Sequence, residues 1–446
     1  MKILLNPRLS ICASALIAAV CSLTFSSLNP VRAQSFSSTD RDRGRTMLQA
    51  VKEDIKKNYY DPNFHGMDLD ARFNAAEEKI KTATSLGQVF GIIAQAMVDL
   101  NDSHTRFIPP PRVASTEYGW QLQMVGDKCY VSAVKPGSDA EAKGLKEGDE
   151  VISVDGIGLS RQSLWRMRYL YYTLSPRARM RVVARSPKGE PREIEILSKI
   201  KQGRQVVDLT NYTEVRDMLR DAENENRLHA HRYYDDIGDV FIWKMPQFDL
   251  SESKVDEMMN KVGKRKALIL DLRGNGGGDE DTMLRLIGNF FDKDITIGEI
   301  KQRKASKPLV AKTRGNNAYK GQLVVLIDSE SGSAAEVFAR VIQLEKRGTL
   351  IGDLTAGAVM RSKYYGHKLG VDISTFYGAN ITDADLVMTD GKSLENVGVT
   401  PDELLLLTGA DLAGRRDPVM ARAASLIGLK LEPEKAGALF PVQWGK

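Results

Sequence analysis

Residues 324–338 read Val-Val-Leu-Ile-Asp-Ser-Glu-Ser-Gly-Ser-Ala-Ala-Glu-Val-Phe. An apolar run of strand type leads into a turn of small residues, and a helix-type sequence follows. Ser333 stands where that helix begins, so the helix N–H groups and dipole would favour negative charge developing beside its hydroxyl. A nucleophilic serine needs this environment. Serine is also a common helix cap, and the turn is not the G-x-S-x-G elbow, so this stretch alone leaves both roles open.

A run of glycines follows a second strand-type segment. Residues 268–278 read Leu-Ile-Leu-Asp-Leu-Arg-Gly-Asn-Gly-Gly-Gly. Consecutive glycines allow positive φ angles and close backbone approach, so their N–H groups can serve as an oxyanion hole. A flexible loop is the plainer interpretation. A phosphate cradle is disfavoured, because the segment carries neither G-K-[ST] nor a G-x-G-x-x-G that opens a helix.

The chain around these two segments alternates strands and helices from residue 239 onward. Such alternation favours a largely parallel sheet packed by helices. The strands are predicted at 240–244, 267–272, 322–327 and 349–352, and the helices at 252–262, 281–291 and 334–345. After a further core strand and helix, residues 429–446 are predicted to be a loosely held end.

Two other regions precede this core. Apolar residues at helical spacing predict three helices between 40 and 112. The period then changes to short strands bounded by turns, with one helix at 160–174. The charged residues 203–236 are predicted to be a linker or hairpin insertion. His229 and His231 alternate there as on a strand, which suits half a metal site, but a solvated hairpin is favoured because no third ligand stands nearby.

The N-terminus has the pattern of an export signal. Lys2 and Arg8 precede an apolar run at 11–25, and Val31 and Ala33 fit the positions before a cleavage site. We expect cleavage after Ala33. The apolar run is shorter than the roughly 20 residues that span a bilayer, so we expect a soluble exported protein without a stable membrane anchor, in the periplasm or outside the cell.

The composition excludes several classes of protein. The chain has 446 residues, is 42% hydrophobic and 27% charged, and has a formal charge of +5. This is ordinary for globular domains, and so weak a charge gives no support for a nucleic-acid partner. Loss of the three basic residues in 1–33 would lower the charge to +2, and only Cys129 of the three cysteines would remain, so no internal disulfide could form.

Residues 134–156 resemble the core of a bacterial PDZ domain. They read Val-Lys-Pro-Gly-Ser-Asp-Ala-Glu-Ala-Lys-Gly-Leu-Lys-Glu-Gly-Asp-Glu-Val-Ile-Ser-Val-Asp-Gly. In that family a peptide adds as a strand, and a loop of N–H groups captures its C-terminal carboxylate. The resemblance implies that Tyr118, Gly119, Trp120 and Gln121 form this substrate-binding loop, with Trp120 in place of a smaller aliphatic residue that is common there.

The serine turn and the glycine loop together resemble the C-terminal processing and tricorn-type peptidases, which form one serine peptidase family. In that family a D-x-R-x-N-x-G-G loop lies beside an S-x-S-A-x-E turn. The resemblance implies a multidomain α+β protein with a helical N-terminal region, a PDZ module and an α/β spiral core of the crotonase or ClpP type. It assigns the nucleophile to Ser333 and the two oxyanion donors to the N–H groups of Gly278 and Ala334.

The family uses two kinds of general base. In the Ser/Lys branch a lysine follows the nucleophile helix, but Ala358 occupies that position in this chain. Lys363 is the nearest substitute, and it follows a segment, 359–361, that is predicted to be irregular. A lysine base would also need its pKa lowered by burial.

The tricorn-like branch uses a histidine with an adjacent serine and a distant glutamate. Ser103, His104 and Glu395 match those three positions. Imidazole titrates near neutrality, so His104 can take the Ser333 proton, with Ser103 and Glu395 behind it as the carboxylate stands in a triad. His104 alone or Glu395 alone could be an ordinary loop residue. Their joint presence, with the lysine missing, favours this branch.

These assignments divide the chain into six parts. They are a signal peptide (1–33), a helical N-terminal region (34–112), a PDZ domain (113–202), a linker or hairpin insertion (203–236), a serine peptidase core (237–408), and a C-terminal helix and tail (409–446).

The sequence therefore predicts an exported serine endopeptidase that acts on proteins or peptides through an acyl-enzyme on Ser333, without metal or other cofactor. The PDZ domain would present or gate substrates through their C-termini. A non-catalytic peptide-binding protein of the same fold and a Ser/Lys peptidase using Lys363 stay open. An acyl-CoA enzyme of crotonase type is disfavoured by the signal and the PDZ module. A homo-oligomer is compatible with the family, which includes trimers and larger rings.

Overall fold

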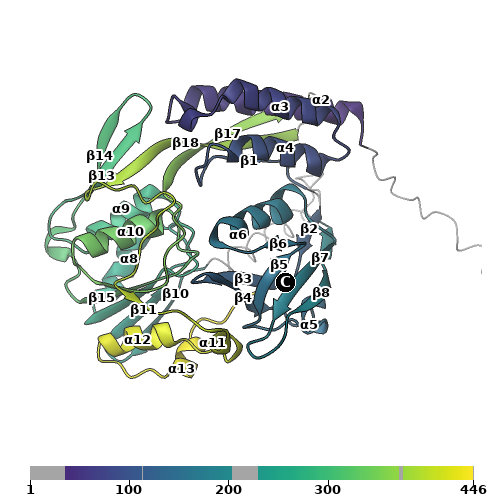
Figure 1. Cartoon of the computed structure of the whole chain (residues 1–446). Helices are drawn as coiled ribbons and strands as arrows, with labels where there is room; N and C mark the ends of the chain where they lie inside the picture. The colour runs from purple at the N-terminus through teal and green to yellow at the C-terminus, as the bar shows by residue number, and fades with distance from the viewer. Residues whose placement is uncertain (1–35, 113, 203–229, 371–374, 445–446) are drawn as a thin grey trace, which may run out of the picture.

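The computed structural model describes residues 36–112, 114–202, 230–370 and 375–444 (Figure 1). The predicted signal peptide lies outside these residues, as do His229 and most of the predicted linker. Among the described helices, none is long and apolar enough to cross a membrane.

The N-terminal region consists of helices, as predicted. They are α2 (Ser38–Asn58), α3 (Leu69–Lys81) and α4 (Leu86–Val98), with a short 3-10 turn η1 (Phe64–Gly66). Each of the three α-helices begins after a Ser or Asp whose side chain accepts a first-turn N–H. The apolar residues at helical spacing are buried in one cluster, which also contains Phe107, Tyr377 and Ala379 from a sheet of the core. The helices therefore pack directly on the core.

The β-rich module is a six-stranded sheet in the order β3-β4-β5-β7-β8, with β6 paired to β5. Its strands are β3 (Trp120–Val125), β4 (Lys128–Val134), β5 (Glu150–Val154), β6 (Ile157–Gly158), β7 (Arg179–Arg185) and β8 (Arg192–Leu197). The predicted helix at 160–174 is α6 (Arg161–Arg168) continued by a π-helical turn η2 (Tyr169–Leu174). A small ladder of β2 (Ala114–Glu117) with β9 (Lys199–Gln202) and the short α5 (Asp139–Ala142) complete the module.

The core contains the predicted parallel sheet, in the order β10-β11-β12-β15-β16-β19. Its strands are β10 (Arg232–Ile237), β11 (Val240–Lys244), β12 (Ala267–Asp271), β15 (Gln322–Ile327), β16 (Thr349–Gly352) and β19 (Glu403–Leu404). Every pair from β11 onward is parallel, and β10 is antiparallel to β11.

Helices cover both faces of this sheet. Helices α8 (Glu252–Val262), α9 (Glu280–Gly288) and α10 (Ala334–Leu344) pack on one face, where the largest apolar cluster forms. Helices α12 (Pro418–Leu426) and α13 (Pro433–Gly437) pack on the other, after the short α11 (Gly409–Ala413). In Figure 1 these C-terminal helices lie below the sheet, beside the β-rich module.

Two segments near the core bear on the predictions for its ends. The described end of the range 203–236 is strand β10, which forms a hairpin with β11, one of the two alternatives predicted for this range. The prediction of a loosely held end at 429–446 was wrong for its described part: Ala436 is 3% exposed, and the ring of Phe440 lies 5.3 Å from that of Tyr234. The apolar face of α12 and α13 needs the sheet to cover it, and this holds the tail.

A second, antiparallel sheet was not predicted. It has the order β1-β18-β13-β14, with β17 also paired to β18. Its strands are β1 (Arg106–Ile108), β13 (Ile295–Gln302), β14 (Ser306–Ala311), β17 (Met360–Leu369) and β18 (Thr375–Met388), and a 3-10 turn η3 (Gly315–Asn317) follows β14. The segment predicted to be irregular at 359–361 leads into β17, which begins at Met360 and whose exposed residues, such as Lys363 and Lys368, hide the strand pattern.

The pairing of β1 with β18 decides where the N-terminal loop lies. Phe107 pairs with Ala379, which joins a strand near residue 100 to one near residue 380. The polar loop that ends α4, residues 99–105, is thereby held at the core rather than among the helices.

Candidate active site

Ser333 lies between β15 and α10 in a strained backbone conformation. Its φ is 53° and its ψ is −120°, a region that non-glycine residues rarely adopt and that is typical of functional sites. Ser333 is the cap residue of α10 and shares a capping box with Glu336, whose side chain accepts the Ser333 N–H at 3.0 Å. An ordinary capping serine has an extended backbone. Capping alone therefore does not account for the positive φ of Ser333.

A buried carboxylate holds this turn. Glu336 is fully buried, and its Oε2 accepts the N–H groups of Ser333 at 3.0 Å and Ala358 at 2.9 Å. Its Oε1 accepts the N–H of Gly357 at 2.8 Å and the hydroxyl of Thr355 at 2.5 Å. Burial raises the pKa of Glu336, although these four donors act in the opposite direction. Ala358, where a lysine base would stand, is thus part of the support of the nucleophile turn.

The glycine loop lies directly against Ser333. Gly277 has φ +105°, and a Cβ at this position would lie 2.6 Å from the Cβ of Ser333, so only glycine fits. Within the described residues, the N–H groups of Gly278 and Ala334 donate to no backbone or side-chain acceptor. Two unused donors next to a serine hydroxyl are what an oxyanion hole requires.

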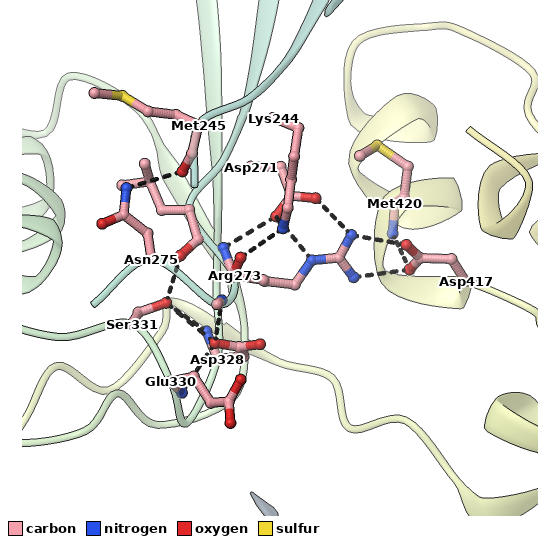
Figure 2. Close-up of polar contacts among 12 residues, drawn as sticks. Lys244, Met245, Asp271, Arg273, Asn275, Asp328, Glu330, Ser331, Asp417 and Met420 are labelled. Carbon is pink, nitrogen blue, oxygen red and sulfur yellow. Dashed lines mark hydrogen bonds and ion pairs between the residues drawn. The ribbon is translucent and has the colours of Figure 1, made fainter. Parts of the chain in front are cut away.

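Buried polar residues fix the glycine loop from behind (Figure 2). Asn275 donates to the Met245 carbonyl at 2.8 Å and accepts the N–H of Gly277 at 2.8 Å. Arg273 lies between Asp271, at 2.9 Å, and Asp417, the residue before α12, at 2.7 Å. Burial alone would raise the pKa of Asp271, but Arg273 and Lys244 outweigh it and lower that pKa.

The roles of these supporting residues were missed in the sequence. The available signal was the D-x-R-x-N part of the glycine motif, which contains Asp271, Arg273 and Asn275. The conformational freedom of the glycines is evident from the sequence alone. The roles of the polar residues depend on partners that are distant in sequence, such as Asp417 for Arg273.

The structure brings Ser103, His104 and Glu395 together. The hydroxyl of Ser103 donates to Glu395 Oε2 at 2.9 Å and lies 2.7 Å from His104 Nδ1. Glu395 also accepts the N–H groups of Ser103 at 2.7 Å and Val359 at 2.8 Å. Since the single hydroxyl proton of Ser103 goes to the carboxylate, His104 Nδ1–H donates to Ser103, which leaves Nε2 as the basic nitrogen.

Burial shifts the pKa values of the two residues at the ends of this hydrogen-bonded series, His104 and Glu395. It lowers the pKa of His104 to about 4, with Arg106 acting in the same direction and Asp102 against it. It raises the pKa of Glu395 to about 7, against the hydrogen bonds from Ser103 and Val359. Oppositely shifted neighbouring groups are characteristic of catalytic sites.

His104, Ser333, Gly278 and Ala334 line one cavity of about 1070 Å³. In the described part of the chain no hydrogen bond joins His104 to Ser333. Such bonds are often long in free enzymes and tighten when substrate binds. Apolar side chains that include Val337 form part of the same lining, which suits a peptide substrate.

Lys363 also lines this cavity, but unlike His104 its side chain is largely exposed. Its ammonium lies 3.3 Å from Asp383, and its side chain is 60% exposed. A lysine base needs a buried site, whereas this side chain is exposed and ion-paired with Asp383. The surroundings of Lys363 therefore do not suit the Ser/Lys mechanism.

The four residues predicted to bind a peptide terminus have unequal surroundings. Tyr118, Gly119 and Trp120 are buried, and Gln121 is exposed. The hydroxyl of Tyr118 donates to the Tyr171 carbonyl at 3.0 Å, so this side chain is part of the interior of the module.

No group of His, Cys, Asp or Glu able to hold a metal occurs among the described residues. His231, one of the two histidines considered for such a site, lies 2.8 Å from Asp249 through Nε2.

Comparison with known proteins gives matches for the core and for the β-rich module. Residues 238–405 match the family model of peptidase family S41, and residues 111–168 match that of the PDZ domain. The tail-specific protease of Haemophilus influenzae is 27% identical over 357 residues, covering 75% of this chain but 48% of that protein. The chloroplastic C-terminal processing peptidase of Tetradesmus obliquus is 23% identical over 375 residues, 78% of this chain and 74% of that protein.

A solved structure has a similar fold. The crystal structure of mature CPAF aligns with a TM-score of 0.62 over 84% of this chain and 95% of that chain, at 17% identity. Such a likeness concerns the fold alone. It confirms the multidomain α+β fold, while the crotonase or ClpP-like spiral stays a prediction.

The fold and these matches define a serine-type peptidase with an embedded PDZ domain. Residues 238–405 are similar to peptidase family S41, as the serine turn and the glycine loop predicted, and a PDZ domain precedes them.

Proposed function

We propose that the protein is an exported serine endopeptidase that cleaves proteins or peptides near their C-termini. The observation that carries this proposal is the hydrogen-bonded chain Glu395–Ser103–His104, which ends at a cavity that Ser333 also lines. The relatives are a tail-specific protease and a C-terminal processing peptidase, and this supports action on protein tails. Export rests on the leader pattern at 1–33.

In the proposed mechanism His104 Nε2 takes the proton of the Ser333 hydroxyl as its oxygen attacks the scissile carbonyl. The imidazolium then gives that proton to the leaving amine, and water releases the acyl group by the same steps. Ser103 holds the tautomer of His104, and Glu395 stabilises the imidazolium through it.

The oxyanion formed during both steps would bind to the N–H groups of Gly278 and Ala334. Both groups are unused in hydrogen bonds within the described chain, and the residue before each, Gly277 or Ser333, donates its N–H to a buried side chain. Preorganised donors of this kind need no rearrangement in the transition state, so they contribute strongly to the rate.

We further propose that the PDZ domain gates the site rather than only holding substrate. The edge strand β3 has two carbonyls that accept from other parts of this chain: Leu122 from Arg168, and Met124 from the Ser329 hydroxyl at 2.6 Å. Ser329 belongs to the turn that carries Ser333. A peptide that adds to β3 would compete for the Met124 carbonyl, and this supports communication between peptide binding and the nucleophile turn.

The test of the proposed activity is cleavage of an unfolded protein by single variants. Ser333→Ala and His104→Ala should each abolish cleavage with unchanged circular dichroism, and Lys363→Ala should retain most activity. A fluorophosphonate probe should label Ser333 in the parent chain, since labelling needs an activated serine.

Ser306→Ala is the matched control, because Ser306 is exposed on β14 and is not among the residues that line the cavity. Full activity of Ser333→Ala would disprove the proposed nucleophile. An inactive Lys363→Ala with an active His104→Ala would transfer the protein to the Ser/Lys mechanism. A parent chain that binds C-terminal peptides but neither cleaves nor reacts with the probe would be a peptide-binding protein.

A further inference from the structure

Asp102 stands immediately before the Ser103–His104 pair and organises their loop from inside. Its Oδ1 accepts the N–H groups of His104 at 2.9 Å and Thr105 at 2.6 Å, and the hydroxyl of Thr382 at 2.7 Å. The residue is 9% exposed. One carboxylate oxygen thus holds the backbone N–H groups of His104 and of the residue after it.

The same oxygen ties the loop to strand β18. Thr382 donates its hydroxyl to Asp102 and its N–H to the Thr105 hydroxyl at 3.1 Å, and Thr105 donates to the Thr382 hydroxyl at 3.0 Å. The β1–β18 ladder begins one residue later, at Arg106. The loop is therefore anchored to the sheet that also leads to Glu395.

Asparagine at position 102 could keep the Oδ1 acceptor, so the charge and the second oxygen, Oδ2, distinguish aspartate from a neutral amide here. Within the described residues, Asp102 Oδ2 and the Tyr59 hydroxyl are both buried without a hydrogen-bond partner. They are close enough that, after burial, the charge of Asp102 and a weak hydrogen-bond contact with it raise the pKa of Tyr59. A buried charge whose second oxygen has no well-formed hydrogen bond is costly, and loop geometry alone would be served by asparagine.

We propose that Asp102 is a positioning residue for the general base, holding the His104 backbone through Oδ1 and stabilising the protonated imidazole through its charge. This inference rests on the proposed peptidase function. The catalytic assignments above give Asp102 no role: it does not itself line the cavity, and it contacts the site only through His104.

Several other charges act on this loop. Arg106 on β1 opposes the imidazolium, and Asp102 favours it. Asp102 also raises the pKa of Glu395. Tyr60 lies in the loop after α2, and its hydroxyl is 2.7 Å from His65 Nε2. Burial raises the pKa of Tyr60, and the charges of Asp385, Asp102, Asp61 and Glu395 raise it further. The net effect of removing one charge must therefore be measured as a pH profile.

The experiment compares Asp102→Asn and Asp102→Ala in the full chain, with Asp99→Asn as the exposed control. The pH dependence of kcat/KM for an unfolded protein substrate is measured together with kcat, KM and the thermal melt. Asn keeps the acceptor but removes the charge. We expect it to retain most of kcat near neutrality and to move the acid limb of the profile down by about half to one pH unit.

Asp102→Ala removes the acceptor as well, and it should lower kcat by about 100-fold with little change in KM, as expected for a displaced catalytic group. An unmoved acid limb in Asp102→Asn, or equal kcat in Asp102→Ala and the parent chain, would overturn the proposal. Equal losses in both variants would also overturn it, because Asn retains the acceptor. If the Ala variant does not fold, the acid limb of the Asn variant decides.

The two proposals fail in different ways. An inactive parent chain that does not react with the fluorophosphonate probe would contradict the peptidase function itself. An active, labelled parent chain with unaffected Asp102 variants would contradict only the role of Asp102.

Discussion

At the scale of single residues, Ser333 is held in an unfavourable conformation by one side chain. A non-glycine residue with positive φ costs about 1–3 kcal/mol unless its surroundings impose it. Glu336 imposes it by accepting the N–H of Ser333 and three further donors from residues 355–358. The nucleophile turn therefore depends on a carboxylate with four acceptor sites.

Glu336→Gln tests this dependence. An amide nitrogen would face two of the donors that now point at a carboxylate oxygen, so buried N–H groups would be left unpaired. We expect a loss of about 1–3 kcal/mol in the free energy of unfolding and slower labelling of Ser333 by a fluorophosphonate. Glu345→Gln, on the exposed end of the same helix, is the control. Unchanged labelling and stability would show that the turn is held by other contacts.

At the scale of elements, the PDZ strand β3 and the nucleophile turn are joined side by side. Besides the bond from Ser329 to Met124, Gln123 donates to Asp328 at 2.7 Å, and Arg168 on α6 lies 2.6 Å from Glu330. Residues 328–330 are thus all in contact with the PDZ domain. Binding at β3 and the conformation of the turn are expected to be linked thermodynamically.

Ser329→Ala should free the Met124 carbonyl for a bound peptide. The gain is one hydrogen bond of about 0.5–1.5 kcal/mol, so a fluorescent peptide with a free C-terminus should bind about 2–10 times more tightly. Fluorescence anisotropy measures this, and Ser306→Ala should bind like the parent chain. Weaker or equal binding by Ser329→Ala would exclude competition at β3.

At the scale of the whole molecule, the proposed base is assembled from distant parts of the chain. Ser103 and Glu395 are 292 positions apart. The β1–β18 pairing and the packing of the N-terminal helices on the core bring them together. Their burial in this arrangement separates the pKa of His104, about 4, from that of Glu395, about 7.

The pH profile of kcat/KM should reflect both groups. His104 has a lowered pKa and stays neutral until the pH falls to about 4. Glu395 has a raised pKa and loses its charge as the pH falls through about 7, which weakens support of the imidazolium. We expect activity to decline below pH 7 and to vanish near pH 4. Glu395→Gln should be slower and should lack the step near pH 7; a profile unchanged by this variant would contradict the role of Glu395.

Much of the fold could be predicted because burial leaves a periodic signal. Helices α2 to α4 bury residues at helical spacing, and β11, β12 and β15 are continuous apolar runs. Strand β17 was missed because its exposed residues interrupt that signal, and β18 was missed because polar residues such as Thr382 and Asp383 are buried along it. Lys363 was accordingly placed in an irregular segment, although it lies on β17.

The candidate site divides in the same way. Ser333 and the glycines could be recognised from local sequence, since a strained turn and a close backbone approach need small residues there. The supports of the site could not be recognised, because Glu336, Arg273 and Asp102 act through partners that are distant in sequence.

By itself, the sequence determined the similarity of residues 238–405 to peptidase family S41, the PDZ-like segment before them and the two motifs of the site, because each is written in contiguous residues. Only the tertiary structure decided that Ser103 and His104 meet Glu395 beside the cavity of Ser333, that Lys363 is exposed and paired, and that the PDZ edge touches the nucleophile turn. The physical reason is that strand pairing and burial bring together groups that are far apart in the chain, and the distances and pKa values of the site arise only from that contact.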